Sequence, residues 1–167
     1  MRIRPLWVAL AILLVPAIAR ADGHRAGLFG AYSAAHGSVL QGVHVNFDYA
    51  GTGTTPAAKI WAAMVDYSVH DGDGFQRHTF TGGLSGSHRL NQVVVGFQAL
   101  GGRVWGDGSA DWAGTFGAAF EWVGSPSAAR LNGVHFAPRV QTDWIVRSGK
   151  AESFWRVSTG IVVRFPK

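Results

Sequence analysis

The chain contains no cysteine, few charged residues and, after its first 21 residues, no apolar run long enough for a membrane-spanning helix. The absence of cysteine excludes disulfide bonds, so an exported fold would have to be closed by hydrogen bonding. Asp, Glu, Lys and Arg make up 15% of the 167 residues. A soluble domain with so few charges would be poorly soluble, whereas a barrel that turns half of its residues toward lipid needs few.

The first 21 residues have the features of a secretory signal peptide. Two arginines give a basic start, an apolar run covers residues 6–18, and residues 19–21 (Ala-Arg-Ala) have the small-x-small form of a cleavage site. An uncleaved membrane anchor is the alternative, but the apolar run is short for a spanning helix and Pro16 interrupts it. Cleavage would leave residues 22–167 as one domain.

The basic charge of the precursor lies partly in this leader. Removing residues 1–21 lowers the formal net charge from +5 to +2, because three arginines and no acid are lost. No cluster of Lys or Arg remains in residues 22–167. We therefore expect no nucleic-acid partner.

The segment 153–165 alternates between an apolar and a more polar row of side chains. Successive side chains of a strand point to opposite faces, so this pattern predicts one apolar face and one face with two arginines. The length fits a tilted membrane-spanning strand, and an aromatic residue stands at each end of the apolar row. That row consists of Trp155, Val157, Thr159, Ile161, Val163 and Phe165.

The same alternation, broken by Gly, Pro, Asn and Asp, predicts eight strands. They cover about residues 24–34, 39–49, 58–70, 75–87, 92–105, 111–123, 133–147 and 153–165. We expect an all-β protein, an eight-stranded antiparallel up-and-down transmembrane β-barrel, which is the smallest common barrel of this kind. The pattern does not fix the facing of the first strand. A tight turn is predicted at 87–91, and a bulge or a missing ladder bond at Pro138.

Strand alternation also sorts the charged and aromatic side chains between the two faces. The predicted interior holds Asp48, Asp66, Arg77, Glu121, Arg139, Asp143, Arg156 and Arg164, together with His44 and His70. The outward aromatic residues fall at strand ends and predict two girdles. With the N-terminus in the periplasm, Tyr49, Trp61, Trp122, Phe136 and Phe165 belong to the periplasmic girdle. The outer girdle then contains Tyr67, Trp105, Trp112, Trp144 and Trp155.

The chain resembles the outer-membrane protein A type of β-barrel domain. The resemblance rests on residues 28–33 (LFGAYS), 65–70 (VDYSVH), 139–144 (RVQTDW) and 160–165 (GIVVRF), and it covers nearly all of residues 24–165. It implies that the outer-membrane assembly machinery reads Val157, Thr159, Ile161, Val163 and Phe165 as a C-terminal signal. Pro166 and Lys167 depart from the usual terminal Phe. The periplasmic peptidoglycan-binding domain of some relatives is not expected.

The inward charges have two interpretations. An eight-stranded barrel is just wide enough to be filled by side chains, and unpaired charge in its interior would be costly, so we favour a packed network of acids and arginines. A narrow proton or ion path is the alternative. A calcium site in the Asp/Gly loop 71–74 is less favoured because the distal Glu of the known motif is missing. A metal held by His36, His70 and His78 lacks a supporting spacing.

Two further classes are disfavoured. An outer-membrane lipid hydrolase could use Ser68 and His70, but both are predicted to point inward and no G-x-S-x-G elbow occurs. A soluble lipocalin-like carrier would not need two aromatic girdles. We therefore expect a monomeric, non-enzymatic outer-membrane barrel with a structural or surface-interacting role and no cofactor. Its expected partners are outer-membrane lipid or lipopolysaccharide and the assembly machinery.

Overall fold

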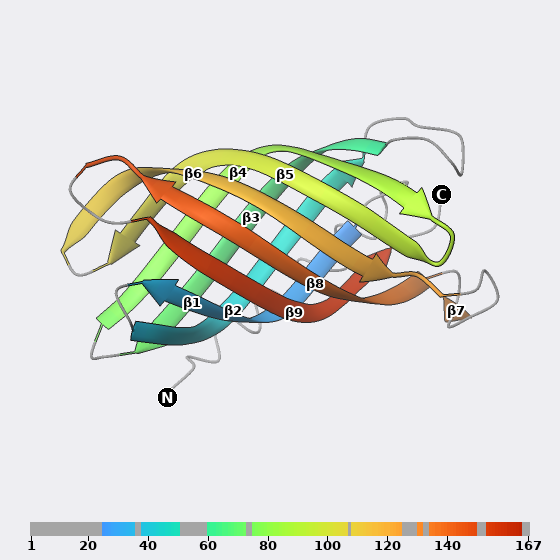
Figure 1. Ribbon diagram of the computed structural model, residues 1–167, viewed down its shortest axis with the longest axis horizontal. Helices are drawn as coiled ribbons and strands as arrows, with labels where there is room; N and C mark the ends of the chain where they lie inside the picture. The colour runs from blue at the N-terminus through green and yellow to red at the C-terminus, as the bar shows by residue number, and fades with distance from the viewer. Residues whose placement is uncertain are drawn as a thin grey trace.

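The computed structural model describes residues 25–35, 38–50, 60–72, 75–106, 108–124, 130–131, 134–149 and 153–164. These residues form nine strands inclined around a common axis (Figure 1). The strands are β1 (Arg25–Ala35), β2 (Ser38–Ala50), β3 (Ile60–Gly72), β4 (Phe75–Leu90), β5 (Val93–Gly106), β6 (Ser109–Trp122), β7 (Arg130–Leu131), β8 (Val134–Arg147) and β9 (Phe154–Arg164). In this part of the chain, no helix has the length and apolar character needed to cross a membrane.

The eight long strands form one closed antiparallel sheet. The strands pair in the order β6-β5-β4-β3-β2-β1-β9-β8, in which the first and last strands, β1 and β9, are neighbours, and a further pairing of β6 with β8 closes the cylinder. The two-residue strand β7 pairs only with the start of β8. The predicted eight-stranded up-and-down barrel is therefore confirmed, with β7 as a short addition at its edge.

The predicted turn at 87–91 is wrong in position. Strand β4 continues to Leu90 and pairs with β5 up to Leu90↔Val93, so the turn consists of Asn91 and Gln92. Asn91 has a φ of 57°, a left-handed conformation that Asn tolerates better than most residues. The polar residues at 87–89 (Ser-His-Arg) have a composition typical of a loop. However, Ser87 is buried, and polar side chains are expected on the inner face of a strand in this barrel.

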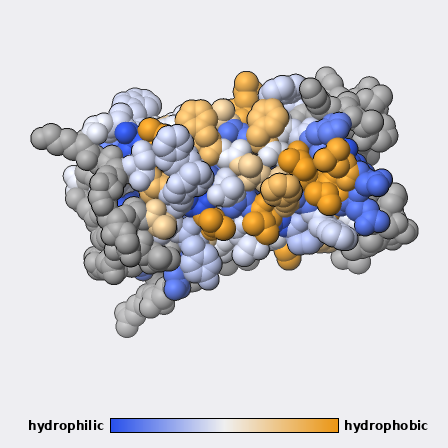
Figure 2. Space-filling model, in the orientation of Figure 1, coloured by the Kyte–Doolittle hydropathy of each residue, from blue (hydrophilic) through white to orange (hydrophobic). Residues whose placement is uncertain are grey.

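The side chains alternate between a polar interior and an apolar outer wall. In β1, whose facing the pattern left open, Phe29, Ala31 and Ser33 are buried while Leu28 and Tyr32 are exposed. Figure 2 shows apolar side chains exposed along the wall of the barrel. A closed sheet with this inverted distribution is suited to lipid outside and to packed polar side chains inside.

Pro138 marks the point where one ladder ends. The β8–β9 register runs continuously through Pro138↔Ile161, so there is no bulge on that side. The β6–β8 ladder stops at Glu121↔Arg139, one residue before the proline. Of the two predicted outcomes, the end of this ladder fits the missing ladder bond, since proline has no amide hydrogen to donate.

Inward-facing glycines allow the strands to curve tightly around a narrow interior. A Cβ atom at Gly42, Gly102 or Gly160 would overlap the carbonyl oxygen of a residue on the neighbouring strand. For Gly102 on β5 the overlapping oxygen belongs to Phe80 on β4. Small barrels need such positions, since a flat pleated sheet does not close.

Gly101 and Gly102 lie on opposite faces of β5, so we expect an added methyl group to have different effects at the two positions. Gly102→Ala should destabilise the barrel by about 1–3 kcal/mol, because the backbone of β4 or β5 must shift to admit the methyl group. Gly101→Ala should be neutral or slightly stabilising, because nothing lies within 4 Å of its added Cβ atom on the outer wall. Urea titration of the two variants refolded in lipid vesicles measures the difference. Equal midpoints would contradict the assigned faces and the glycine-dependent curvature.

Candidate functional site in the barrel interior

A single guanidinium group joins two carboxylates in the middle of the barrel. Arg156 of β9 approaches Asp66 of β3 at 2.9 Å and Asp143 of β8 at 2.7 Å. All three side chains are 0% exposed. Asp143 lies beside Arg156 because the two are direct partners in the β8–β9 register. Asp66 reaches the same guanidinium although it lies 90 residues earlier in the chain.

Neutral polar side chains complete this network. Arg156 also donates to the hydroxyl of Ser68 at 2.9 Å. The amide of Gln98 donates to Asp143 at 2.7 Å, and the amide of Gln141 donates to both oxygens of the same carboxylate at 3.1 and 2.9 Å. Because two carboxylates meet one arginine, these donors stabilise the remaining negative charge.

His44 links this network to Ser158 in a Ser-His-Asp arrangement. The Nε2 atom of His44 makes a close contact with the carboxylate of Asp66, and Nδ1 lies 3.0 Å from the hydroxyl of Ser158. With a neutral ring, Nε2–H donates to the carboxylate and Nδ1 accepts from the serine. These are the residue types of a hydrolase triad. However, Ser158, His44 and Asp66 are all completely buried, so no substrate reaches the serine.

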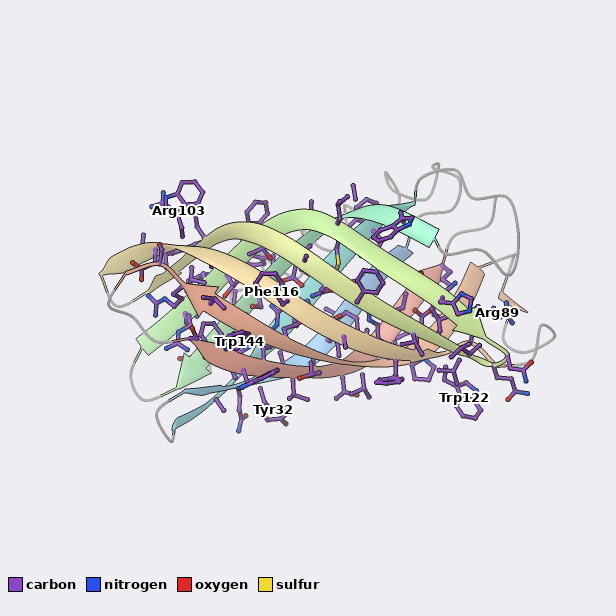
Figure 3. The ribbon with its side chains drawn as sticks, turned by 45° about the horizontal axis from the view of Figure 1, so that its top comes forward. Tyr32, Arg89, Arg103, Phe116, Trp122 and Trp144 are labelled. Carbon is purple, nitrogen blue, oxygen red and sulfur yellow. The ribbon has the colours of Figure 1, made fainter. Side chains whose placement is uncertain are left out.

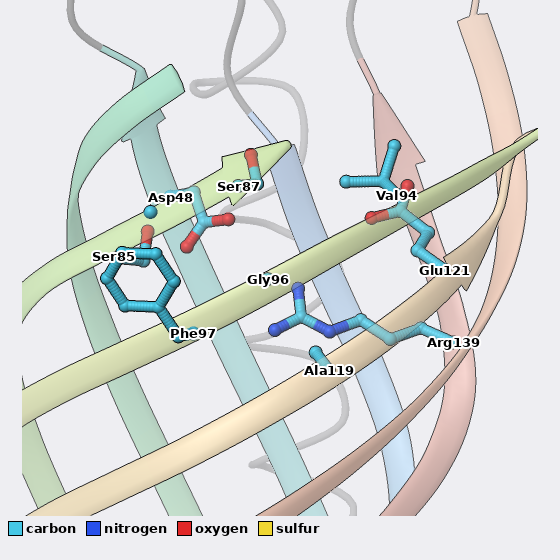
Figure 4. Close-up of a pocket in the computed structure, with 10 residues that line it drawn as sticks. Asp48, Ser85, Ser87, Val94, Gly96, Phe97, Ala119, Glu121 and Arg139 are labelled. Atoms are coloured by element: carbon cyan, nitrogen blue, oxygen red, sulfur yellow. The ribbon is translucent and has the colours of Figure 1, made fainter. Parts of the chain in front are cut away.

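The end of the interior nearest the β4–β5 turn contains a second set of charges. Arg164 pairs with Glu121 at 2.6 Å, and Arg139 donates to Gln141 at 2.7 Å. Beside them lies a cavity of about 10 Å³, which is space for about one water molecule (Figure 4). Its lining includes Asp48, Glu121 and Arg139. A ligand site for a metabolite would need a volume some thirty times larger.

The opposite end of the interior contains a cluster of buried apolar side chains. Val104, Ala113, Ile145 and Phe154 form one buried cluster. The guanidinium of Arg77 lies over the ring of Phe154, 4.6 Å from its centroid. Three regions therefore follow one another along the axis. Charged residues lie at the end nearest the β4–β5 turn, the Arg156 network fills the middle, and the apolar cluster lies at the opposite end.

The structure places all eight predicted interior charges on the inner face. Asp48, Asp66, Glu121, Arg139, Asp143 and Arg156 are buried, and Arg77 and Arg164 are half-buried. The sequence did not identify which partners meet. It also missed the ion pair of Asp111 with Arg147 at 2.5 Å and the Ser158–His44–Asp66 line. Alternation places the last three residues inside, but only the register brings them together.

The alternative sites considered from the sequence are not assembled in the described residues. Ser68 is bound to Arg156, not to His70. His70 lies inside, whereas His78 lies on the outer wall against Tyr67, and His36 is outside the described residues. No group of three or more possible metal ligands occurs in the described part of the chain. Residues 73 and 74 of the Asp/Gly loop are also outside it.

Outward aromatic residues occur at the ends of the wall and also between them. In Figure 3, Trp122 lies near one end, and Phe116 lies beside its register partner Trp144 toward the other. Trp144 and Trp155 stack at 6.2 Å between ring centroids, and Trp61 packs edge-on against Phe97. The other described members of the two belts are Tyr67, Trp105, Trp112 and Phe136. The side chain of Tyr49 and residue Phe165 lie outside the described part.

The outward residues of the final strand are also described up to Val163. Val157, Thr159 and Ile161 are exposed and Val163 is half-buried. The apolar row of β9 therefore lies on the outer wall, as its alternation predicts.

Comparison with known proteins finds similarity only at the level of structure. No family model and no curated protein sequence matches the chain. The crystal structure of Neisserial surface protein A is similar over 87% of this chain and 96% of that one, with 12% identity and a TM-score of 0.59. The outer membrane enzyme PagL is similar over 86% and 99%, with 10% identity and a TM-score of 0.51. The chain thus has the fold of small eight-stranded transmembrane β-barrels of the outer membrane.

Proposed function

We propose that this chain is an integral outer-membrane protein, exported through residues 1–21, with a structural or surface-interacting role and a closed lumen. The observation that carries the proposal is the Arg156 network, which fills the middle of the barrel with completely buried side chains. An apolar wall bounded by aromatic residues supports the membrane location. The type of barrel that fits best is the single-domain outer-membrane protein A type.

The interior does not favour a stable pore. An ion passing the middle layer would have to separate Arg156 from Asp66 and Asp143, and breaking a buried ion pair costs roughly 3–5 kcal/mol. The apolar cluster around Phe154 presents a second barrier, since it offers a passing ion no ligands. A narrow path for ions or protons is therefore the less favoured function.

An enzyme of the hydrolase class has one observation in its favour, the Ser158–His44–Asp66 line. Its geometry supports a structural role instead. Asp66 is shared with Arg156, and the cavity of about 10 Å³ beside Glu121 and Arg139 is too small for a substrate and is not lined by Ser158. The line is better explained as a way of satisfying buried polar groups.

Insertion into the membrane is proposed to depend on β9. Its outward row, Val157, Thr159, Ile161 and Val163, would present the C-terminal signal, together with Phe165, to the assembly machinery. The same strand carries Arg156 on its inner face. One segment would thus serve both recognition during assembly and closure of the finished interior.

The proposed location predicts two results from cells that express the full chain. The protein should fractionate with the outer membrane and begin at Asp22, because residues 19–21 form the cleavage site. It should also migrate differently on gels before and after boiling, because a closed barrel has no free edge from which to unfold. Recovery in the periplasmic supernatant would contradict the membrane location.

The closed lumen predicts the absence of a steady current. Wild-type protein inserted into planar bilayers should show no stable conductance, since both the Arg156 layer and the Phe154 cluster must open before an ion passes. A large and stable wild-type conductance would refute the closed lumen and favour the pore.

The Arg156 network predicts that the loss of unfolding free energy on removing an arginine depends strongly on where that arginine lies. Arg156→Met should lower the unfolding free energy by roughly 3–5 kcal/mol, because it leaves two buried carboxylates without their cation. Arg147→Met is the comparison variant: it removes the same charge at the end of the interior, from a pair whose side chains are 10% and 22% exposed, and should cost less than Arg156→Met because water can reach the Asp111 carboxylate that it leaves behind. Urea unfolding in vesicles compares them. Similar losses would show that the central arginine is no more important than the peripheral one.

A further inference from the structure

Arg103 differs from the other arginines whose side chains the structure describes. Of these seven, five face the interior: Arg77, Arg139, Arg147, Arg156 and Arg164. Arg89 lies beside the β4–β5 turn and donates to the carbonyl oxygen of Asn91 at 2.9 Å. Arg103 projects from the outer wall near the opposite end of the barrel (Figure 3), and no described carboxylate pairs with it.

The neighbours of Arg103 are apolar and face outward. The strand register places Phe80 of β4 on one side and Trp112 of β6 on the other. Phe80 is 50% exposed and Trp112 is 66% exposed. The guanidinium of Arg103 lies over the indole of Trp112, 5.4 Å from the ring centroid. A permanent charge therefore sits among side chains that are suited to lipid contact.

The surrounding aromatic residues place Arg103 at the depth of the lipid headgroups. Trp105 lies two residues along the same face of β5, and the ring of His78 stacks on it at 5.3 Å. The hydroxyl of Tyr67 lies 2.9 Å from Nδ1 of His78. Tyr and Trp gather where membrane meets water, because one end of each side chain is apolar and the other is polar.

We propose that Arg103, held in place by Trp112, binds the phosphate of an anionic lipid headgroup. The contact with the indole of Trp112 restrains the guanidinium, whose N–H groups can donate to two phosphate oxygens. A lipid fits better than a free phosphate ion, because Phe80 and Trp112 offer apolar surface for acyl chains next to the charge. This inference rests on the proposed membrane location.

Native mass spectrometry of the refolded barrel can test the site. The protein is inserted into vesicles of phosphatidylglycerol and phosphatidylcholine, released in mild detergent, and the bound lipids are counted. Wild type should retain phosphatidylglycerol preferentially. Arg103→Gln should reduce that preference about 10-fold, the equivalent of one charge-assisted hydrogen bond. Arg89→Gln, the control at the other end of the barrel beside the β4–β5 turn, should leave it unchanged.

Three results would overturn the assignment. The first is an unchanged preference in Arg103→Gln while its heat-modifiable migration shows a folded barrel. The second is an equal loss in Arg89→Gln, which would indicate general charge attraction. The third is displacement of phosphatidylglycerol by inorganic phosphate, which would make the site one for a free anion. Failure of wild type to insert into any vesicle would instead overturn the membrane location and the lipid site together.

Discussion

The buried charge of Arg156 is the centre of the hydrogen-bond network in the interior of the barrel. Removing a guanidinium group from water is costly, and only well-placed anions and acceptors offset that cost. Asp66 and Asp143 supply the anions, and Ser68 supplies a further acceptor. These residues come from β3, β8 and β9, so the network joins strands that are not all neighbours in the sheet. A shift of one residue in any of these strands would turn its charged side chain toward lipid, which makes the register strongly specified.

The same arrangement limits where function can lie. Among the described residues, the cavity beside Glu121 and Arg139 has a volume of only about 10 Å³, and the Ser158–His44–Asp66 line is sealed from solvent. The chemistry that is accessible lies on the outer wall and at the ends of the barrel. The described outer wall is largely aromatic and apolar and carries Arg103, while Arg89 is exposed at the end of the barrel beside the β4–β5 turn. This distribution supports the proposed structural or surface-interacting role.

Alternation alone predicted the barrel and the face of all eight interior charges, because burial in a sheet has a period of two. It did not predict that Asp66 and Arg156 meet, because their contact spans 90 residues and depends on the tilt and stagger of the closed sheet. It misplaced the turn after β4, because a polar residue such as Ser87 fits a loop and the polar interior of this barrel equally well. In β1, glycine and alanine weaken the contrast between faces, so the inward position of Phe29 required the structure.

The early end of the β6–β8 ladder at Pro138 has a consequence for how the cylinder is joined. This pairing comprises nine residue pairs, from Ala113↔Arg147 to Glu121↔Arg139, whereas β5 and β6 share fourteen. The junction is also not a tight hairpin, because the segment between β6 and β8 includes the separate strand β7. With nine residue pairs, one fewer than the β1–β9 and β2–β3 ladders, it is the shortest ladder between long strands and therefore the line along which the wall would part first under strain. The ion pair of Arg164 with Glu121 connects β9 to β6 across this junction and therefore helps to hold it closed.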